Sequence, residues 1–143
     1  MNIRNAEERD CLSLVRLISR LGYAAGVEEL RTRLGLYSRS ELDRVLVADI
    51  DGTVVGLIVL NAIKPFHEKS LWGRISALVV DESVRGKGIG TRFLHASDDF
   101  FIALGCSKVE LTSGEQRVEA HEFYKGRGFE DVPKRFVKRF ELK

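Results

Sequence analysis

A glycine-rich segment between a predicted strand and a predicted helix has the composition of a phosphate-binding turn. Residues 85–90 read Arg-Gly-Lys-Gly-Ile-Gly, with three glycines and two cations. The first N–H groups of a helix have no acceptor within the helix, and they point outward at the positive end of the helix dipole. Glycines there remove the Cβ atoms that would keep a ligand oxygen away from these N–H groups. The segment therefore predicts an anion site at the start of the helix.

Two common phosphate motifs do not fit this segment. A Walker loop ends in Gly-Lys-Ser/Thr, whereas Gly86-Lys87 is followed here by Gly88. A dinucleotide fingerprint counted from Gly88 requires glycine at the position of Phe93. Two interpretations remain, a flexible glycine turn with two solvated cations and a different kind of phosphate loop, Arg-x-x-Gly-x-Gly.

A second segment also contains residues that could take part in a reaction. It places a tyrosine on a short predicted helix, which two glycines terminate. Residues 120–129 read Ala-His-Glu-Phe-Tyr-Lys-Gly-Arg-Gly-Phe. A phenol has a pKa of about 10, so a tyrosine at this position carries a proton that it could donate at neutral pH. The alternative for Tyr124 is a core tyrosine packed beside Phe123.

The elements that must position these segments follow from hydrophobic periodicity. Apolar residues recur at helical spacing over 11–21 and 27–34, and Asn5 followed by Glu8 resembles a capping box before the first of these helices. The β-rich runs 45–50 and 53–60 are separated only by Asp51-Gly52, which is typical of a two-residue hairpin. Further strands are expected at 1–4, 71–80, 108–112 and 135–142, and further helices at 91–104 and 119–125.

Composition narrows the class of protein. The 143 residues are 44% hydrophobic and 31% charged, which is typical of one globular domain, here spanning 1–143. A net charge of +2 offers no excess for binding a nucleic-acid backbone. The two cysteines have no zinc or disulfide spacing, and no apolar run reaches the roughly 20 residues of a membrane span. We therefore expect a cytoplasmic protein without a nucleic-acid or membrane partner.

In this order and spacing, the two motifs resemble the pyrophosphate loop and the Ala-x-x-Phe-Tyr-x-x-x-Gly-Phe segment of the GNAT family of N-acetyltransferases. The resemblance covers the chain from about Val45 to its end, and residues 1–34 are compatible with the more variable opening of the family. It implies an α/β fold with a mixed, mostly antiparallel sheet that is splayed between its fourth and fifth strands and has helices on both faces.

The resemblance also implies acetyl-CoA as co-substrate, and no metal. Pantetheine would pair like an added strand with the fourth strand, and the pyrophosphate would lie on the N–H groups of the glycine loop. Arg117 stands where many relatives carry a cofactor-binding asparagine, so it either contacts the cofactor or is a surface cation. The implied cofactor-binding residues are Leu78, Val79, Val80, Arg85, Gly86, Lys87, Gly88, Ile89, Gly90, Thr91, Arg117, Ala120 and Tyr124.

Acetyl transfer to an amine requires a neutral nucleophile, donors for the developing oxyanion and a proton for the thiolate. The resemblance assigns the oxyanion to a backbone N–H at Leu78 or its neighbour, and the proton to Tyr124. Deprotonating an alkylammonium of pKa about 10.4 at pH 7 costs about 4 to 5 kcal/mol. Many relatives carry a glutamate at the position of Ser76 or Thr112. The base is therefore left open between Glu68, Glu110 and water.

Residues 47–140 are also similar to aminoalkylphosphonate N-acetyltransferases, which implies a small primary amine that attacks directly in a ternary complex. His67, Glu68 and His121 are candidate acceptor contacts. The apolar final strand often forms dimers in the family, so a homodimer is expected. Two alternatives stay open: a catalytically silent module that binds acyl-CoA as a sensor or partner, and a nucleotide-binding regulator that uses the glycine loop.

Overall fold

The computed structural model describes residues 1–111, 118–132 and 135–142. They fall into two compact units, Met1–Thr112 and Ser113–Lys143, and each is described by itself. The first unit contains β1 (Asn2–Asn5), the 3₁₀ turn η1 (Glu8–Asp10), α1 (Cys11–Ser19), α2 (Val27–Ser38), β2 (Asp43–Ile50), β3 (Thr53–Ile63), β4 (Trp72–Val80), the 3₁₀ turn η2 (Glu82–Val84), α3 (Ile89–Ala103) and β5 (Val109–Leu111). The second unit contains α4 (Val118–Lys125).

The sheet of the first unit is mixed and mostly antiparallel, as expected. Its strand order is β1-β2-β3-β4-β5, and only β4 and β5 run parallel. The predicted hairpin joins β2 to β3, with Asp51 at φ 50° and Gly52 at φ 87°. Positive φ at both turn residues is the requirement of a type I′ turn, which explains why the Asp-Gly pair marks this connection.

The sheet opens between β4 and β5. Their pairing is confined to Gly73–Ile75 on β4 and Val109–Leu111 on β5. Along β3, Val59 pairs with Ala77 and Leu60 with Ile75, so Ser76 is the extra residue of a β-bulge. Within the described ranges, no strand lies beside residues 76–80 of β4 on the side away from β3.

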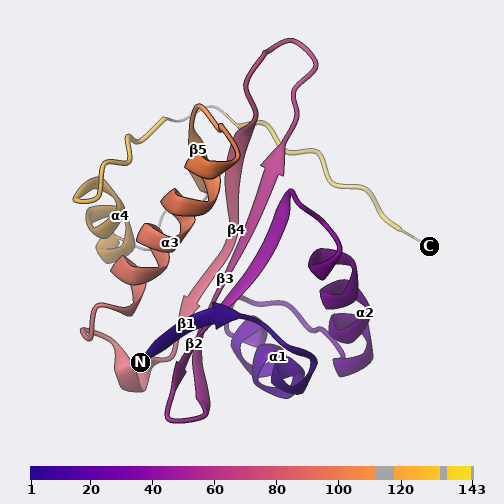
Figure 1. Cartoon of the computed structure of the whole chain (residues 1–143), viewed down its shortest axis with the longest axis vertical. Helices are drawn as coiled ribbons and strands as arrows, with labels where there is room; N and C mark the ends of the chain where they lie inside the picture. Colours follow the sequence, from indigo (N-terminus) through magenta and orange to yellow (C-terminus); the bar gives the residue numbers. More distant parts are fainter. Residues whose placement is uncertain (112–117, 133–134, 143) are drawn as a thin grey trace. The chain divides into compact units, whose positions relative to one another are not determined.

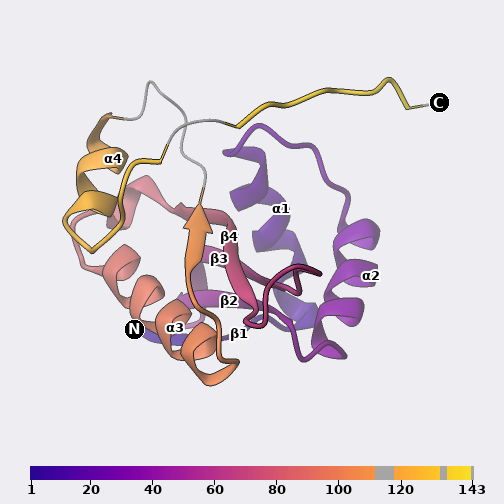
Figure 2. The ribbon, with the colours of Figure 1, turned by 90° about the horizontal axis from the view of Figure 1, so that it is seen from above.

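Helices cover both faces of this sheet, with α1 and α2 on one side and α3 on the other (Figures 1 and 2). Two glycines bring α3 close to the strands. A Cβ at Gly56 would lie 2.9 Å from the ring of Phe93, and one at Gly73 would lie 2.6 Å from the ring of Phe101. The core under α1 and α2 is apolar and includes Cys11, Leu14, Leu17, Leu30, Val47 and Leu57.

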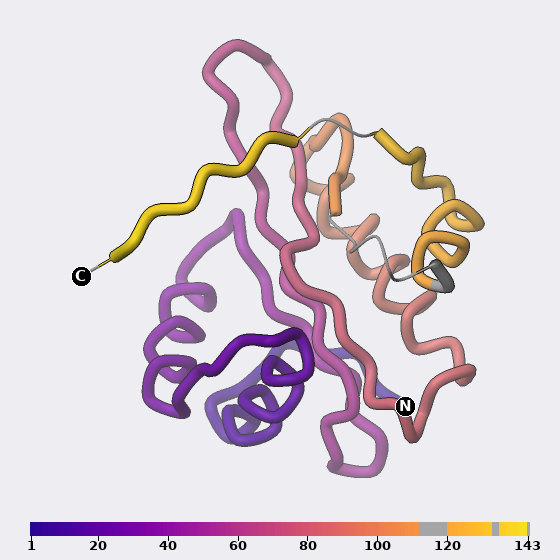
Figure 3. Tube along the Cα trace, turned by 180° about the vertical axis from the view of Figure 1, so that it is seen from behind, coloured from indigo at the N-terminus to yellow at the C-terminus, as the bar shows by residue number. Residues whose placement is uncertain are grey.

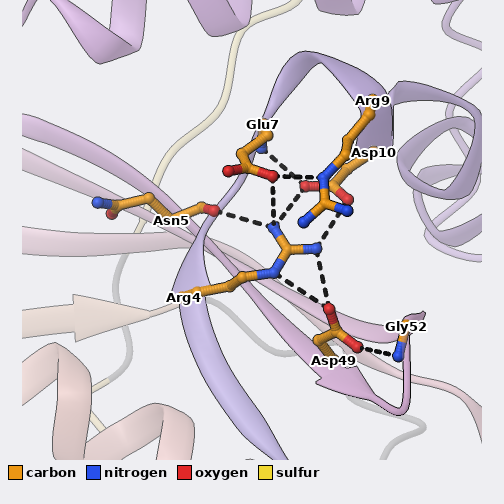
Figure 4. Close-up of polar contacts among 7 residues, drawn as sticks. All are labelled: Arg4, Asn5, Glu7, Arg9, Asp10, Asp49 and Gly52. Carbon is orange, nitrogen blue, oxygen red and sulfur yellow. Dashed lines mark hydrogen bonds and ion pairs between the residues drawn. The ribbon is translucent and has the colours of Figure 1, made fainter.

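An ionic network ties the first strand to the turn before α1 and to the β2–β3 hairpin (Figure 4). The guanidinium of Arg4 donates to both carboxylate oxygens of Asp10, at 2.8 and 2.9 Å, and to Asp49 at 3.2 Å. Asp10 also accepts from the Glu7 N–H at 2.7 Å. Burial opposes ionisation of Asp10, but the hydrogen bonds from Arg4 and the Glu7 N–H outweigh it, so the pKa of Asp10 lies below its ordinary value.

Two local predictions are wrong. The capping box forms between Glu7 and Asp10 rather than Asn5 and Glu8, because Arg4 draws Asp10 into the buried position that faces the Glu7 N–H. Residues 135–142 form no strand, and the side chains of Phe136, Phe140 and Leu142 are exposed. An alternating pattern needs a neighbouring strand to accept its hydrogen bonds, and no described strand pairs with this segment.

The loop that joins β3 to β4, residues 64–71, extends beyond the ends of α1, α2 and α3 (Figure 3). Phe66, His67 and Glu68 are all exposed on it. No helix in the described ranges is both long enough and apolar enough to cross a membrane.

Arg4→Met is expected to destabilise the protein by about 3 kcal/mol, because it leaves the Asp10 carboxylate buried without its cation. Urea unfolding at pH 7 measures this loss. Arg33→Met is the matched control, since among the described residues Arg33 pairs only with the exposed Glu29, at 3.6 Å. A similar loss in both variants would contradict the role of the network, and Arg4→Met combined with Asp10→Leu should recover most of the stability.

Candidate active site

The turn that follows β4 is anchored by Asp81. Its carboxylate accepts from the Ser83 N–H at 3.1 Å and the Ser83 hydroxyl at 3.0 Å, and from Arg16 of α1 at 2.8 Å. Its backbone N–H donates to the carbonyl of Val55 at 2.8 Å. The hydrogen bonds from the Ser83 backbone and from Arg16 lower the pKa of Asp81 to about 2. The turn is therefore fixed to both α1 and β3 before the glycine-rich segment begins.

The glycine-rich segment exposes a run of backbone donors. Gly86 and Gly88 have φ of +83° and +78°, and a Cβ at either position would meet nothing within 4 Å. The Arg92 N–H makes the first bond of α3, to the carbonyl of Gly88 at 3.1 Å. None of the N–H groups of residues 86–90 donates to an acceptor in the described part of the chain.

The surroundings of this run suit an anion. Arg85 and Lys87 are exposed beside it, and Arg85 makes a long ion pair with Glu82, at 3.9 Å. Ile89, at the first position of α3, is 2% exposed and holds the start of the helix against the core. Thr91 is half-buried in the first turn. N–H groups without described acceptors beside two exposed cations are what the predicted anion site requires, and the site itself stays a prediction.

The open edge of β4 leads directly into this segment. Val80, Val79 and Leu78 pair with Gly56, Leu57 and Ile58 of β3 on one side, and their other edge has no described strand beside it. A strand edge of this kind can pair with an extended ligand through its backbone N–H and C=O groups. The structure thus brings the predicted residues from Leu78 to Thr91 onto one continuous path.

Tyr124 belongs to the second unit, where the end of α4 holds its ring. The Phe129 N–H donates to the carbonyl of Tyr124 at 3.1 Å and the Gly128 N–H to that of Lys125 at 3.3 Å, with Gly128 at φ 90°. This is the Schellman pattern, and it places the ring of Phe129 5.8 Å from that of Tyr124. The Gly-Phe pair of the motif therefore ends the helix and orients the tyrosine. Ala120 and His121 are half-buried on the same helix.

The predicted acidic residues, Glu68 and Glu110, are exposed and lie beside basic side chains. Glu68 is 3.7 Å from His67 in the β3–β4 loop. Glu110 lies opposite Arg74 in the register and pairs with it at 3.8 Å, and with Lys108 at 3.5 Å. These contacts favour the structural interpretation of both carboxylates. Thr112 and Arg117 lie outside the described residues.

Sequence reasoning missed a polar cluster on the sheet face that α2 covers. Asn61 of β3 donates to Asp43 of β2 at 2.7 Å and to the hydroxyl of Tyr37 of α2 at 2.9 Å. Its carbonyl oxygen accepts from the hydroxyl of Ser76, the bulge residue of β4, at 2.5 Å. The available signal was an asparagine near the end of the apolar β3 and an aspartate at the start of β2, but their meeting depends on the strand register.

The sequence profile of the acetyltransferase (GNAT) family matches residues 11–129. An aminoalkylphosphonate N-acetyltransferase of Salmonella typhimurium is 33% identical over 88 residues, which cover 62% of this chain and 57% of that protein's length. A thialysine N-epsilon-acetyltransferase of Bos taurus is 27% identical over 143 residues, covering 91% of this chain and 84% of that protein.

A solved structure supports the fold. The crystal structure of glucosamine-6-phosphate N-acetyltransferase from Arabidopsis thaliana superposes with a TM-score of 0.87, 24% identity and coverage of 98% of each chain. The predicted α/β architecture, with a mostly antiparallel sheet, is therefore confirmed.

Asp81→Asn is expected to lower the melting temperature at pH 7, because the neutral amide loses the charge that Arg16 and the Ser83 N–H stabilise. The pKa of Asp81 is depressed in the folded state, so its contribution is present above the ordinary carboxyl pKa and is lost as the pH falls through about 2. Thermal unfolding at several pH values should show the gap between the two proteins narrow between pH 4 and pH 2. A gap that is independent of pH, or an equal gap for the exposed control Asp98→Asn, would contradict this role.

Proposed function

Because this chain belongs to the acetyltransferase (GNAT) family, we propose that it transfers an acetyl group from acetyl-CoA to a small primary amine, within a single domain that spans residues 1–143. The observation that carries the proposal is the run of N–H groups over residues 86–90, which lies at the end of the open edge of β4. A diphosphate needs several converging donors, and an extended pantetheine arm needs a strand edge.

The described residues fit coenzyme A. The N–H groups of residues 86–90 would hold the diphosphate, with Arg85 and Lys87 adding positive charge. The backbone of Leu78, Val79 and Val80 would pair with the pantetheine amides. Arg117, Ala120 and Thr91 are proposed as further contacts. Acetyl-CoA, when bound, supplies the activated acetyl group.

The proposed chemistry assigns one task to each group. The Leu78 N–H donates to the acetyl oxygen as negative charge develops there, and Tyr124 donates its phenolic proton to the departing sulfur. The amine attacks the carbonyl directly, in a ternary complex. Water is proposed as the proton acceptor, because both carboxylates are exposed, Glu110 pairs with Arg74 and Lys108, and Glu68 lies beside His67.

The names of the relatives support an amine acceptor, since one acts on aminoalkylphosphonates and the other on the ε-amino group of thialysine. His67 and Glu68 on the β3–β4 loop, and His121 on α4, are proposed as acceptor contacts. The expected cytoplasmic location and homodimer stay predictions. The alternative function is a silent acyl-CoA sensor, which is favoured by the absence of an acidic residue at Ser76 and Thr112.

Gly88→Glu is expected to abolish the rise in melting temperature that coenzyme A produces, because a carboxylate would stand where the diphosphate binds. Gly105→Glu is a matched control. Gly105 also has φ +78° and nothing within 4 Å of a Cβ, but it follows the other end of α3. Thermal shift with coenzyme A, and with ATP as competitor, compares the two variants. Normal stabilisation of Gly88→Glu would refute the loop assignment.

Tyr124→Phe is expected to lower kcat by about 10²-fold or more, while the Kd for acetyl-CoA changes less than about twofold, because only the proton donor is removed. Thiol release with a panel of primary amines measures kcat, and calorimetry measures Kd. Tyr23→Phe, at a site 69% exposed, is the control. Unchanged turnover would assign Tyr124 to packing. Binding of acetyl-CoA without thiol release from any amine would favour the silent sensor.

A further inference from the structure

We propose that Tyr37, Asp43, Asn61 and Ser76 form the subsite that receives the amino group of the acceptor, as a primary ammonium. This inference rests on the proposed function and names the part of the site that selects the acceptor. The four side chains come from α2, β2, β3 and β4 and are joined by hydrogen bonds of 2.5 to 2.9 Å. All four lie in the first unit, and Tyr37 belongs to α2, a helix on the opposite side of the sheet from α3 (Figure 2).

The carboxylate of Asp43 determines which atoms of the cluster donate hydrogen bonds and which accept them. A carboxylate can only accept, so the atom of Asn61 that contacts it is the amide nitrogen, and the Asn61 oxygen faces Ser76. Both amide hydrogens of Asn61 are used, by Asp43 and by the Tyr37 oxygen. The Ser76 hydroxyl has given its single proton to Asn61, so the Ser76 oxygen can only accept from a ligand.

Asp43 brings a negative charge that the protein does not pair. Its second oxygen accepts from the Ser40 hydroxyl at 2.7 Å, and no cation contacts the carboxylate in the part of the chain that the structure describes. Arg74, which lies opposite Asn61 in the register, makes its own contacts with Glu110 and the ring of Trp72. A half-buried carboxylate that no described cation pairs, together with the accepting oxygen of Ser76, is complementary to an ammonium group, which has three N–H donors and a positive charge.

The position of Ser76 connects this cluster to the reaction. Ser76 is exposed, occupies the β-bulge and begins the open edge of β4, two residues before the proposed oxyanion donor Leu78. A bulge redirects the side chain of its extra residue. An amine that donates one N–H to the Ser76 oxygen keeps its lone pair free after deprotonation. The cluster would therefore hold the nucleophile beside the acetyl group.

The experiment compares Ser76→Ala and Asp43→Asn with the controls Ser38→Ala and Asp98→Asn, both at exposed helix positions. Putrescine, lysine and 2-aminoethylphosphonate serve as acceptor probes. We expect the KM for each acetylated probe to rise about tenfold or more in both cluster variants, because each loses a contact with a charged group. The Kd for acetyl-CoA, measured by calorimetry without acceptor, should stay within about twofold. Ser76→Thr keeps the hydroxyl and should retain a nearly normal KM.

The outcomes separate the subsite from the proposed function. An unchanged amine KM in Ser76→Ala and Asp43→Asn would overturn the subsite and leave the acetyltransferase proposal intact. A parallel loss of acetyl-CoA affinity would also overturn it, because the cluster would then serve the cofactor or the fold. If the wild-type protein binds acetyl-CoA but acetylates no probe, the proposed function fails and the inference falls with it.

Discussion

Backbone N–H groups that have no acceptor among the described residues are the feature on which the rest of the proposed site depends. Such groups remain exposed at the start of α3 because Gly88, at φ +78°, turns the chain abruptly into the helix. An unsatisfied donor is costly when buried but inexpensive in water. The segment can therefore stay open in the free protein and still offer several donors to an anion.

The rest of the first unit holds these donors in place. Asp81 fixes the turn before them through Arg16, Ser83 and the carbonyl of Val55. Gly56 and Gly73 allow α3 to pack closely on β3 and β4, so that the helix start lies at the end of the open edge. The buried ionic contacts of Arg4 and the close contacts of the two glycines under α3 lie on opposite faces of the same sheet, and both stabilise the first unit.

Features that depend only on residues adjacent in the sequence could be predicted from the sequence. The Asp51-Gly52 hairpin and the glycine loop are set by backbone conformations that few residues adopt, so local sequence reveals them. The polar cluster could not be predicted, because Asp43, Asn61 and Ser76 meet only through strand register and a bulge. The prediction of a strand at 135–142 is wrong for the same reason. A strand needs a second strand beside it, and the residues of this segment alone do not show whether one is there.

The close contacts of the two glycines under α3 also limit which substitutions this part of the protein can accept. Enlarging residue 56 or 73 is tolerated only if the facing ring of Phe93 or Phe101 shrinks at the same time, so the spacing of strand and helix changes only by paired substitutions. On the opposite face, the groups around Asn61 meet through single hydrogen bonds at a partly exposed surface. That surface can therefore be altered one residue at a time while the scaffold remains constant.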